Sequence, residues 1–296
     1  MTESRGSLRQ IVCPLCGPCG ARVLAGETRI IGATPPTAVV RCSRCGLLSR
    51  DPLPSPRELE DLYSGDTLPR AYEEAVGQAY ELGDRKPAPH AAARLVDLER
   101  LLGGPGRLLD VGAARGVFLG LARSRGWQVE GTELSADAVR SARREFSLDL
   151  VRSPVKSAGF GAARFDAVHL NHALEHLPEP IRSLQEIHRL LRPRGILAIE
   201  VPNEFGDLMG IVRERLLGRP RKAYAVPSPH LYFFTPSTLR AVVRRAGFQV
   251  HSLRTPRRAR YPGSFIPFGS WAKRALYLLE GWFKRGPLIE LYAVKP

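Results

Sequence analysis

The residues that most clearly suggest chemistry form a turn bounded by two glycines, Gly112 and Gly116. A short apolar stretch runs into Asp110 ahead of this turn, and apolar residues with helical spacing begin near Val117. A strand, a glycine turn and a helix in this order present a nucleoside-shaped ligand at a strand end, because glycine lets the backbone approach closely and the helix turns free amides toward the ligand. The pattern predicts a site for a nucleotide-like cofactor, although the same turn also occurs where a chain only needs a tight bend.

An acid follows at a fitting distance. Glu133 ends a second short strand, Trp127–Glu133, roughly 20 residues beyond the turn, where a carboxylate can accept both hydroxyls of a ribose. We therefore predict Glu133 as the ribose ligand. The alternative is a solvated carboxylate at the start of a helix capped by Ser135.

Further strands and helices alternate along the chain. Residues 165–171 predict a buried strand that emerges at Asn171, and Pro180 opens a helix that stops at 193–195. The next predicted strand, 195–201, is almost wholly apolar, and 288–294 predicts the last strand. Alternation of this kind implies a parallel sheet with right-handed crossovers.

Five motifs in this order resemble those of class I S-adenosylmethionine-dependent methyltransferases. They are Leu-Leu-Asp-Val-Gly-Ala-Ala-Arg-Gly (108–116), Glu-Leu-Ser (133–135), Phe-Asp-Ala-Val-His-Leu-Asn-His-Ala-Leu-Glu-His-Leu-Pro (165–178), Leu-Leu-Arg-Pro-Arg-Gly (190–195) and Glu-Val-Pro-Asn (200–203). The resemblance covers about 101–250 and favours the branch that acts on small molecules. It implies a doubly wound, Rossmann-like α/β sheet, mostly parallel with an antiparallel last strand.

The resemblance also implies roles for single residues. Gly112 and Gly116 would line the methionine end of the cofactor, with Asp110 at the start of the same motif, Glu133 would hold the ribose, and Asn171 would lie beside the sulfonium. Ala114 stands where many members of the family have a third glycine, which affects only the detailed geometry of the loop.

Three histidines are candidates for the acceptor side of such a site. A sulfonium already makes its methyl group electrophilic, so the protein must align a nucleophile and, for a hydroxyl or a carbon acid, remove a proton. His172, His176 and His230 lie in segments that should face the methyl end, and we predict His176 and His230 as catalytic bases. The alternative for each is a structural, hydrogen-bonded imidazole, and Glu175 would either orient a histidine or belong to the edge of the core.

Two Cys-x-x-Cys pairs near the start of the chain predict a structural zinc site. Their ligands would be Cys13, Cys16, Cys42 and Cys45, and the short segment around them is too poor in large apolar residues to fold without a metal. A pair of disulfides in an exported protein is the alternative, but no signal peptide precedes the cysteines. Cys19 is a fifth cysteine, which would either replace one ligand or remain a free thiol.

A site closed by four cysteines has no open coordination position, so we assign this zinc to structure or to substrate docking. Residues 40–63 resemble the small zinc ribbon that precedes the methyltransferase domain in a group of bacterial enzymes acting on small molecules, sugars among them. We predict a ribbon at 1–50, a helical connector at 51–98 and a methyltransferase domain at 99–296. That domain would contain a lid at about 209–234 and a basic insertion at about 255–287.

Composition limits the remaining possibilities. The chain has 296 residues with 44% hydrophobic content, which is typical of a folded protein, and no apolar run reaches the roughly 18 residues of a membrane span. We expect a cytoplasmic protein. The net charge is +15, and the segment from Arg254 onward contains nine basic and two acidic residues. Its amphipathic pattern around Trp271–Phe283 predicts a helix packed on the sheet, or one that contacts an anionic membrane, a lipid-like or phosphorylated substrate, or nucleic acid.

Three functions fit these observations. The first is methyl transfer to oxygen, nitrogen or carbon of a small acceptor, such as a sugar or a polyketide-like or lipid-like compound. The second is RNA methylation, which a basic surface and a zinc ribbon would suit. Against it, Asn171 is followed by His-Ala-Leu-Glu, without the Pro-Pro-aromatic turn common in enzymes that methylate base amines. The third is a non-catalytic interaction protein with this cofactor fold.

Overall fold

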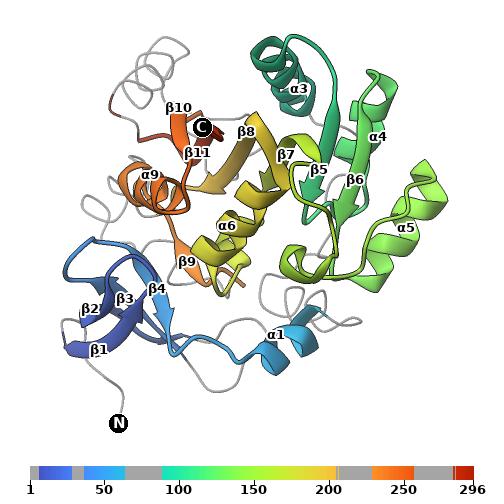
Figure 1. Cartoon of the computed structure of the whole chain (residues 1–296). Helices are drawn as coiled ribbons and strands as arrows, with labels where there is room; N and C mark the ends of the chain where they lie inside the picture. The colour runs from blue at the N-terminus through green and yellow to red at the C-terminus, as the bar shows by residue number, and fades with distance from the viewer. Residues whose placement is uncertain are drawn as a thin grey trace, which may run out of the picture.

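The computed structural model describes residues 7–28, 37–63, 89–204, 206, 229–256, 283 and 285–296. Figure 1 shows a small sheet formed by the start of the chain, beside a larger sheet with helices on both faces. Part of the predicted connector, most of the predicted lid and the predicted basic helix lie outside the described residues.

The larger sheet has six strands in the order β10-β11-β8-β7-β5-β6. Strands β8, β7, β5 and β6 pair in parallel, and β11 lies antiparallel to both of its neighbours. This arrangement confirms the doubly wound, mostly parallel sheet with an antiparallel last strand. The strands are β5 (Arg107–Val111), β6 (Gln128–Thr132), β7 (Phe165–Asn171), β8 (Leu191–Pro202), β10 (Gln249–Arg254) and β11 (Leu288–Val294).

Helices cover each face of this sheet with a separate hydrophobic cluster. Apolar side chains of α3 (Pro89–Leu102), α4 (Val117–Ser124) and α5 (Ala136–Phe146) pack on one face. Those of α6 (Pro180–Leu190) and α9 (Pro236–Arg245) pack on the other. Two short 3-10 turns, Val155–Ser157 and Leu174–His176, complete the layers.

One predicted boundary is wrong. The helix that opens at Pro180 ends at Leu190, and β8 begins at Leu191, not at residue 195. Arg192 precedes Pro193, and the residue before a proline is pushed out of the helical region into an extended conformation. The chain therefore leaves the helix earlier than the glycine at 195 suggests.

The small sheet contains a strand from the far end of the sequence. Its order is β1 (Leu8–Cys13), β2 (Gly17–Thr28), β3 (Thr37–Cys42), β4 (Leu48–Asp51) and β9 (Tyr232–Phe233). Leu48 pairs with Phe233 and Ser49 with Tyr232, both in antiparallel register. The amide of Arg50 donates to the carbonyl of Leu231 at 2.9 Å. Helix α1 (Pro56–Tyr63) follows this sheet.

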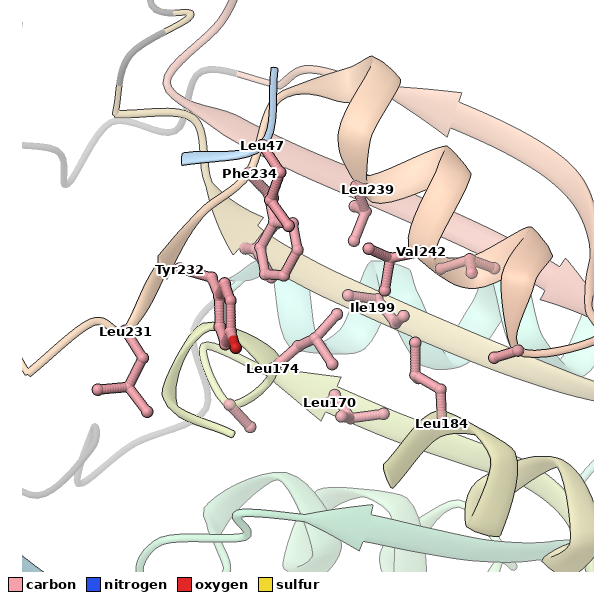
Figure 2. Close-up of a cluster of buried hydrophobic side chains, with 14 of the residues drawn as sticks. Leu47, Leu170, Leu174, Leu184, Ile199, Leu231, Tyr232, Phe234, Leu239 and Val242 are labelled. Atoms are coloured by element: carbon pink, nitrogen blue, oxygen red, sulfur yellow. The ribbon is translucent and has the colours of Figure 1, made fainter. Parts of the chain in front are cut away.

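The two sheets share one hydrophobic core. Figure 2 shows Leu47, from the ribbon, with Leu231, Tyr232 and Phe234 beside apolar side chains of the larger sheet and its helices. All four of these side chains are at most 2% exposed. The predicted ribbon therefore packs against the larger sheet through buried side chains, as neighbouring layers of one domain do. None of the described helices combines the length and the apolar character needed to cross a lipid bilayer.

Candidate functional site

The glycine turn lies where β5 ends and is tied to the neighbouring strand. Gly112 is exposed and has a φ of +75°, and the amides of Gly112 and Ala113 both donate to the carbonyl of Thr132, at the end of β6. A Cβ atom on Gly112 would lie 3.1 Å from the Cβ of Ala173, in the turn after β7. Three strand ends therefore meet around an exposed backbone.

Glu133 turns its carboxylate onto this loop. One oxygen accepts the amide of Ala114 at 2.9 Å, and the other accepts the amides of Leu134 and Ser135 at 2.7 and 2.8 Å. Ser135 also caps α5, as the alternative interpretation of Glu133 expects. A carboxylate has about four acceptor positions, so the side chain, which is only partly buried, retains room for a further hydroxyl donor.

Gly116 lies behind the turn. It is buried with a φ of +78°, and a Cβ atom there would meet Leu148 Cδ1 at 2.8 Å and Ala142 Cβ at 3.1 Å. A glycine is required here by the backbone conformation and by the close packing of α5 and the segment after it.

Replacing Gly116 with alanine should therefore lower the free energy of unfolding by about 2 kcal/mol, from overpacking and a strained φ together. Urea denaturation of the purified protein measures this. Gly161→Ala is the matched control, because nothing lies within 4 Å of the position that its added Cβ atom would take and its φ is not positive. Equal stability of the two variants would contradict the packing argument.

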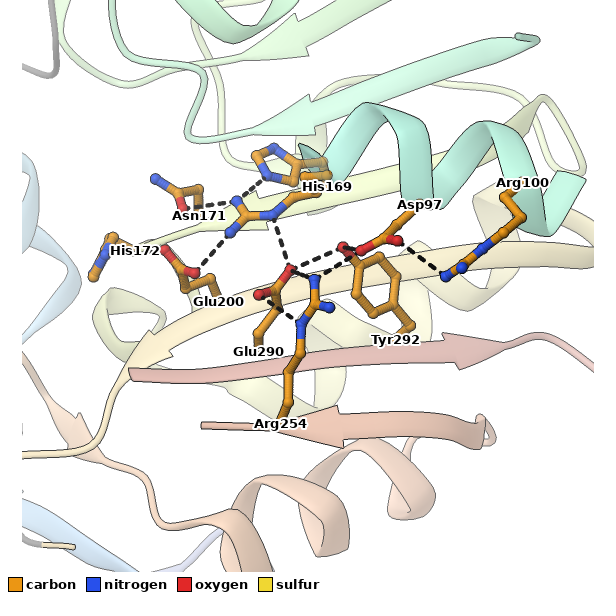
Figure 3. Close-up of polar contacts among 10 residues, drawn as sticks. Asp97, Arg100, His169, Asn171, His172, Glu200, Arg254, Glu290 and Tyr292 are labelled. Carbon is orange, nitrogen blue, oxygen red and sulfur yellow. Dashed lines mark hydrogen bonds and ion pairs between the residues drawn. The ribbon is translucent and has the colours of Figure 1, made fainter. Parts of the chain in front are cut away.

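A row of polar side chains crosses four neighbouring strands of the large sheet, β5, β7, β8 and β11, and Figure 3 shows the part of the row on β7, β8 and β11. Asp110 on β5 pairs in register with His169 on β7, and Glu200 on β8 pairs with Asn171 on one side and Glu290 on the other. His169 Nδ1 donates to Asp110 at 2.7 Å. All five side chains lie on the face that α3 covers, because residues two apart in a strand share a face.

Arg94, on the covering helix α3, contacts this row of side chains. Its guanidinium lies 2.7 Å from Glu200, 2.9 Å from Asn171 Oδ1, 2.8 Å from His169 Nε2 and 3.7 Å from Glu290. Arg94, Glu200 and Glu290 are each at most 2% exposed. Arg94 thus holds Asn171 in place at the end of β7.

Sequence reasoning missed Arg94, His169, Glu200 and Glu290 as site residues. The available signal was a charged residue inside an apolar stretch: Glu200 interrupts a strand that is covered on both faces, and Arg94 lies between alanines and Leu95. Charges at such positions are almost always paired.

A second cluster lies in the turn after β7. One ring nitrogen each of His176 and His230 and a carboxylate oxygen of Glu175 all lie within 4.8 Å of one another. The two imidazole rings meet edge to face with centroids 4.8 Å apart. His172 Nδ1 lies 3.4 Å from Glu175 Oε1. The structure therefore brings together the two predicted bases and the acid between them.

Contacts from several segments hold the two imidazoles. His230 Nδ1 contacts Glu204 Oε1 at 3.1 Å, and His176 Nδ1 lies 3.3 Å from the carbonyl of Pro229. The hydroxyl of Tyr63, on α1, lies 3.0 Å from the same nitrogen of His176. Arg50, from the ribbon, donates its Nε to the carbonyl of His230 at 3.0 Å. The ribbon and α1 therefore help to position this cluster.

The electrostatics differ between the two histidines. Burial, together with the charge of His230, lowers the pKa of His176 to about 4. Burial also acts to lower the pKa of His230, but the carboxylates of Glu204 and Glu175 outweigh it and raise that pKa above its usual value. Burial acts to raise the pKa of Glu175, yet the surrounding histidines bring it below its usual value. At neutral pH, the imidazole of His176 is thus neutral.

The four predicted zinc ligands also converge. The sulfur atoms of Cys13, Cys16, Cys42 and Cys45 lie within 4.8 Å of one another, and all five cysteines are free of disulfides. Zinc–sulfur bonds of about 2.3 Å separate tetrahedral ligands by about 3.8 Å, so these positions fit a zinc ion with little adjustment. Cys19 Sγ lies 3.5 Å from Cys42 Sγ, outside this group of four.

Backbone amides favour a thiolate at Cys42. Burial acts to raise the pKa of this thiol, but the amides of Cys45 and Arg44 and the neighbouring thiols lower it to about 6. Amides that point at a cysteine sulfur from its own Cys-x-x-Cys turn stabilise the charged form that binds metal.

Comparisons with known proteins agree with this fold. A family described as "Methyltransferase domain" matches residues 85–253. Malonyl-[acyl-carrier protein] O-methyltransferase of Enterobacter lignolyticus is 33% identical over 93 residues, covering 31% of this chain and 37% of the relative. Ubiquinone biosynthesis O-methyltransferase of Xanthomonas axonopodis is 30% identical over 157 residues, covering 50% of this chain and 64% of the relative. The chain thus matches less than two thirds of either relative.

Among solved structures, a Burkholderia thailandensis 1,6-didemethyltoxoflavin-N1-methyltransferase has a TM-score of 0.53 at 22% identity, over 91% of this chain and 99% of that one. The [4+2]-cyclase SpnF has a TM-score of 0.52 at 23% identity, over 83% of this chain and 98% of that one. At these identities the likeness concerns the fold alone. The match to the family over more than half of the sequence, on a Rossmann-like sheet with the glycine turn at its expected strand, shows that the chain belongs to the class I S-adenosylmethionine-dependent methyltransferase family.

Proposed function

We propose that this protein transfers the methyl group of S-adenosylmethionine to a hydroxyl of a small-molecule acceptor. The observation that carries the proposal is the meeting of three strand ends, where the exposed Gly112 turn, Glu133 and Asn171 lie on one side and the Glu175–His176–His230 cluster continues from the same β7 turn. In open α/β sheets ligands bind at such carboxyl ends of strands.

In this proposal the cofactor's sulfonium supplies an electrophilic methyl group. The carboxylate of Glu133 accepts a ribose hydroxyl at its remaining acceptor position, and the exposed backbone at Gly112 borders the methionine end. Gly116 and Asp110 belong to the same motif but are buried, so their role is to hold the turn in place. Asn171, fixed by Arg94, lies beside the sulfonium. Positioning by rigid strand ends supplies most of the rate enhancement in a reaction whose electrophile is already activated.

His176 and His230 are proposed to prepare the acceptor hydroxyl for attack, in the cluster that follows the end of β7. Both side chains are only partly exposed, which suits a small acceptor that can enter the site whole. Both curated relatives carry the name O-methyltransferase, which favours oxygen as the acceptor atom. We also propose that the four ribbon cysteines bind zinc and that the protein works in the cytoplasm, where thiols stay reduced.

Replacing Glu133 with alanine should weaken binding of S-adenosylhomocysteine by about 30- to 100-fold. A hydrogen bond from a ribose hydroxyl to a charged acceptor is lost, which contributes about 1.5 to 3 kcal/mol, and the amides of Ala114, Leu134 and Ser135 lose their acceptor. Isothermal titration calorimetry measures the change directly. The affinity of Glu133→Gln should lie between those of Glu133→Ala and the unaltered protein, because an amide oxygen still accepts a hydrogen bond.

Glu130→Ala is the matched control. It removes a carboxylate from β6, the strand that ends just before Glu133, but one that pairs with Arg164 through two hydrogen bonds from Nη2 and one from Nε. Its affinity for S-adenosylhomocysteine should stay within about twofold of the unaltered protein. Unchanged affinity in Glu133→Ala would remove Glu133 from the cofactor site.

The acceptor class is tested by incubating the protein with methyl-labelled S-adenosylmethionine and three fractions of a bacterial extract: small molecules, RNA and protein. We expect label in the small-molecule fraction, on an oxygen identified by mass spectrometry. Label confined to RNA or to protein would overturn the proposed acceptor class while leaving methyl transfer intact.

A further inference from the structure

We infer that Glu175, His176 and His230 form a binding site for a divalent transition-metal ion, separate from the cysteine site of the ribbon. The inference deepens the proposed function and rests on it for the identity of the methyl donor. Two imidazoles and one carboxylate are a ligand set that suits zinc, iron, cobalt and manganese, and three protein ligands leave at least one coordination position open.

The distances fit such an ion. One ligand atom from each residue lies within 4.8 Å of the other two. Bonds of about 2.1 Å place tetrahedral ligands about 3.4 Å apart, so the side chains need to approach one another by little more than 1 Å. That range is within the reach of χ rotations of two imidazoles and a glutamate.

Glu175 provides an independent observation. Its side chain is 1% exposed, and neither carboxylate oxygen accepts a hydrogen bond of good geometry from any described residue. A buried carboxylate without hydrogen bonds is costly, and its pair with His172 at 3.4 Å compensates only one of the two oxygens. A cation bound between Glu175 and the two imidazoles would satisfy the carboxylate.

The outer contacts of the histidines match those of metal ligands. A ligating histidine commonly donates its other ring N–H to a carboxylate or a backbone carbonyl, which fixes the tautomer and the ring orientation. The carboxylate of Glu204 lies 3.1 Å from His230 Nδ1, and the carbonyl oxygen of Pro229 lies 3.3 Å from His176 Nδ1. Because a carbonyl can only accept, the contact with Pro229 favours a proton on Nδ1 of His176, which the hydroxyl of Tyr63 at 3.0 Å can also accept, and a lone pair on Nε2.

The open position would take the acceptor oxygen. A hydroxyl bound there releases its proton to solvent more readily, and its oxygen then forms the new O–CH3 bond while the S–CH3 bond breaks and sulfur keeps the electron pair. An acceptor with a second oxygen on the adjacent carbon could occupy two positions of a five-coordinate ion. A metal-bound imidazole has no lone pair left for a proton, so in the loaded protein this assignment replaces the role of His176 and His230 as bases.

Cobalt(II) alone is the probe, added to protein whose ribbon cysteines already hold zinc. Cobalt bound by nitrogen and oxygen absorbs in the visible range without the strong near-ultraviolet thiolate bands that a cysteine site would give. We expect one cobalt per chain at this site, with affinity reduced at least about 100-fold in His176→Ala, His230→Ala and Glu175→Gln. Glu204→Gln should lose about 10-fold.

His188→Ala is the matched control, because His188, on α6, packs edge-on against Phe248 and takes no part in the cluster. S-adenosylhomocysteine titration of each variant establishes that it is folded. No cobalt binding, or binding unaffected by His176→Ala and His230→Ala, would overturn the metal site while leaving the proposed function in place. If the unaltered protein did not bind S-adenosylhomocysteine, that result would overturn the proposed function instead.

Discussion

Replacing Cys42 with serine should remove one zinc ion per chain and unfold the small sheet. The hydroxyl of serine is a poor zinc ligand, and the binding energy of a structural zinc is on the order of 10 kcal/mol, more than a small layer of β-strands can supply by packing. Hydrogen exchange across residues 8–51 should rise by several orders of magnitude, because the site links the turn after β1 to the turn after β3. Metal analysis and exchange mass spectrometry measure the two effects.

Cys19→Ser provides the comparison. Cys19 lies beside Cys42 but outside the group of four, so this variant should retain its zinc and its exchange protection. A ribbon that keeps zinc in Cys42→Ser would show that Cys19 takes the vacant position and would overturn the assignment of the ligands.

Replacing Arg94 with methionine should lower the free energy of unfolding by about 3 to 5 kcal/mol at pH 7. The methionine side chain keeps an apolar stem, but Glu200 and Glu290 lose the guanidinium between them, although Glu290 keeps its pair with Arg254 at 3.0 Å. Asn171 also loses its contact with Arg94, so S-adenosylhomocysteine should bind more weakly. Urea denaturation and calorimetry measure these two effects.

The loss of stability should diminish as the pH falls. Burial raises the pKa of Glu200 even with Arg94 present, and removing the guanidinium raises it further. A carboxyl whose pKa is higher in the folded state than in the unfolded state destabilises the fold as it ionises, so stability is greatest below the unfolded pKa and declines as pH rises. The variant should therefore be closer to the unaltered protein at pH 5 than at pH 7.

Arg100→Met is the control on the same helix. Arg100 is 75% exposed and pairs with Asp97 at 3.0 Å, and exposed pairs of this kind contribute at most about 1 kcal/mol. If both variants lost the same stability, the loss would come from the helix and not from the buried row of charges.

Much of the fold could be predicted because its signals are local. Strand β7 and strand β11 begin and end at the predicted residues, since each is an apolar run bounded by residues that end strands. The order of strands follows from the resemblance and from the rule for right-handed crossovers. The convergence of the four cysteines follows from their spacing, because each Cys-x-x-Cys pair is a single turn.

The remaining features depend on contacts between residues far apart in the sequence. Nothing local to Arg94 indicates that it meets Glu200 and Glu290, 106 and 196 positions later. The pairing of β4 with β9 is equally hidden, since Tyr232–Phe233 is too short to be recognised as a strand by periodicity. The association of His176 with His230 was expected only in outline, and the roles of Glu204, Tyr63 and Arg50 in holding them required the structure.

The pairing of Leu48 with Phe233 has a consequence for biosynthesis. A ribosome adds roughly 5 to 20 residues per second, so the outer edge of β4 stays without its partner for about 10 to 40 seconds after it has been made. An open strand edge is a template for pairing with other chains. The cysteine cluster lies on other turns and cannot cover that edge, so a nascent chain stalled before β9 should be markedly more prone to aggregate than the finished polypeptide.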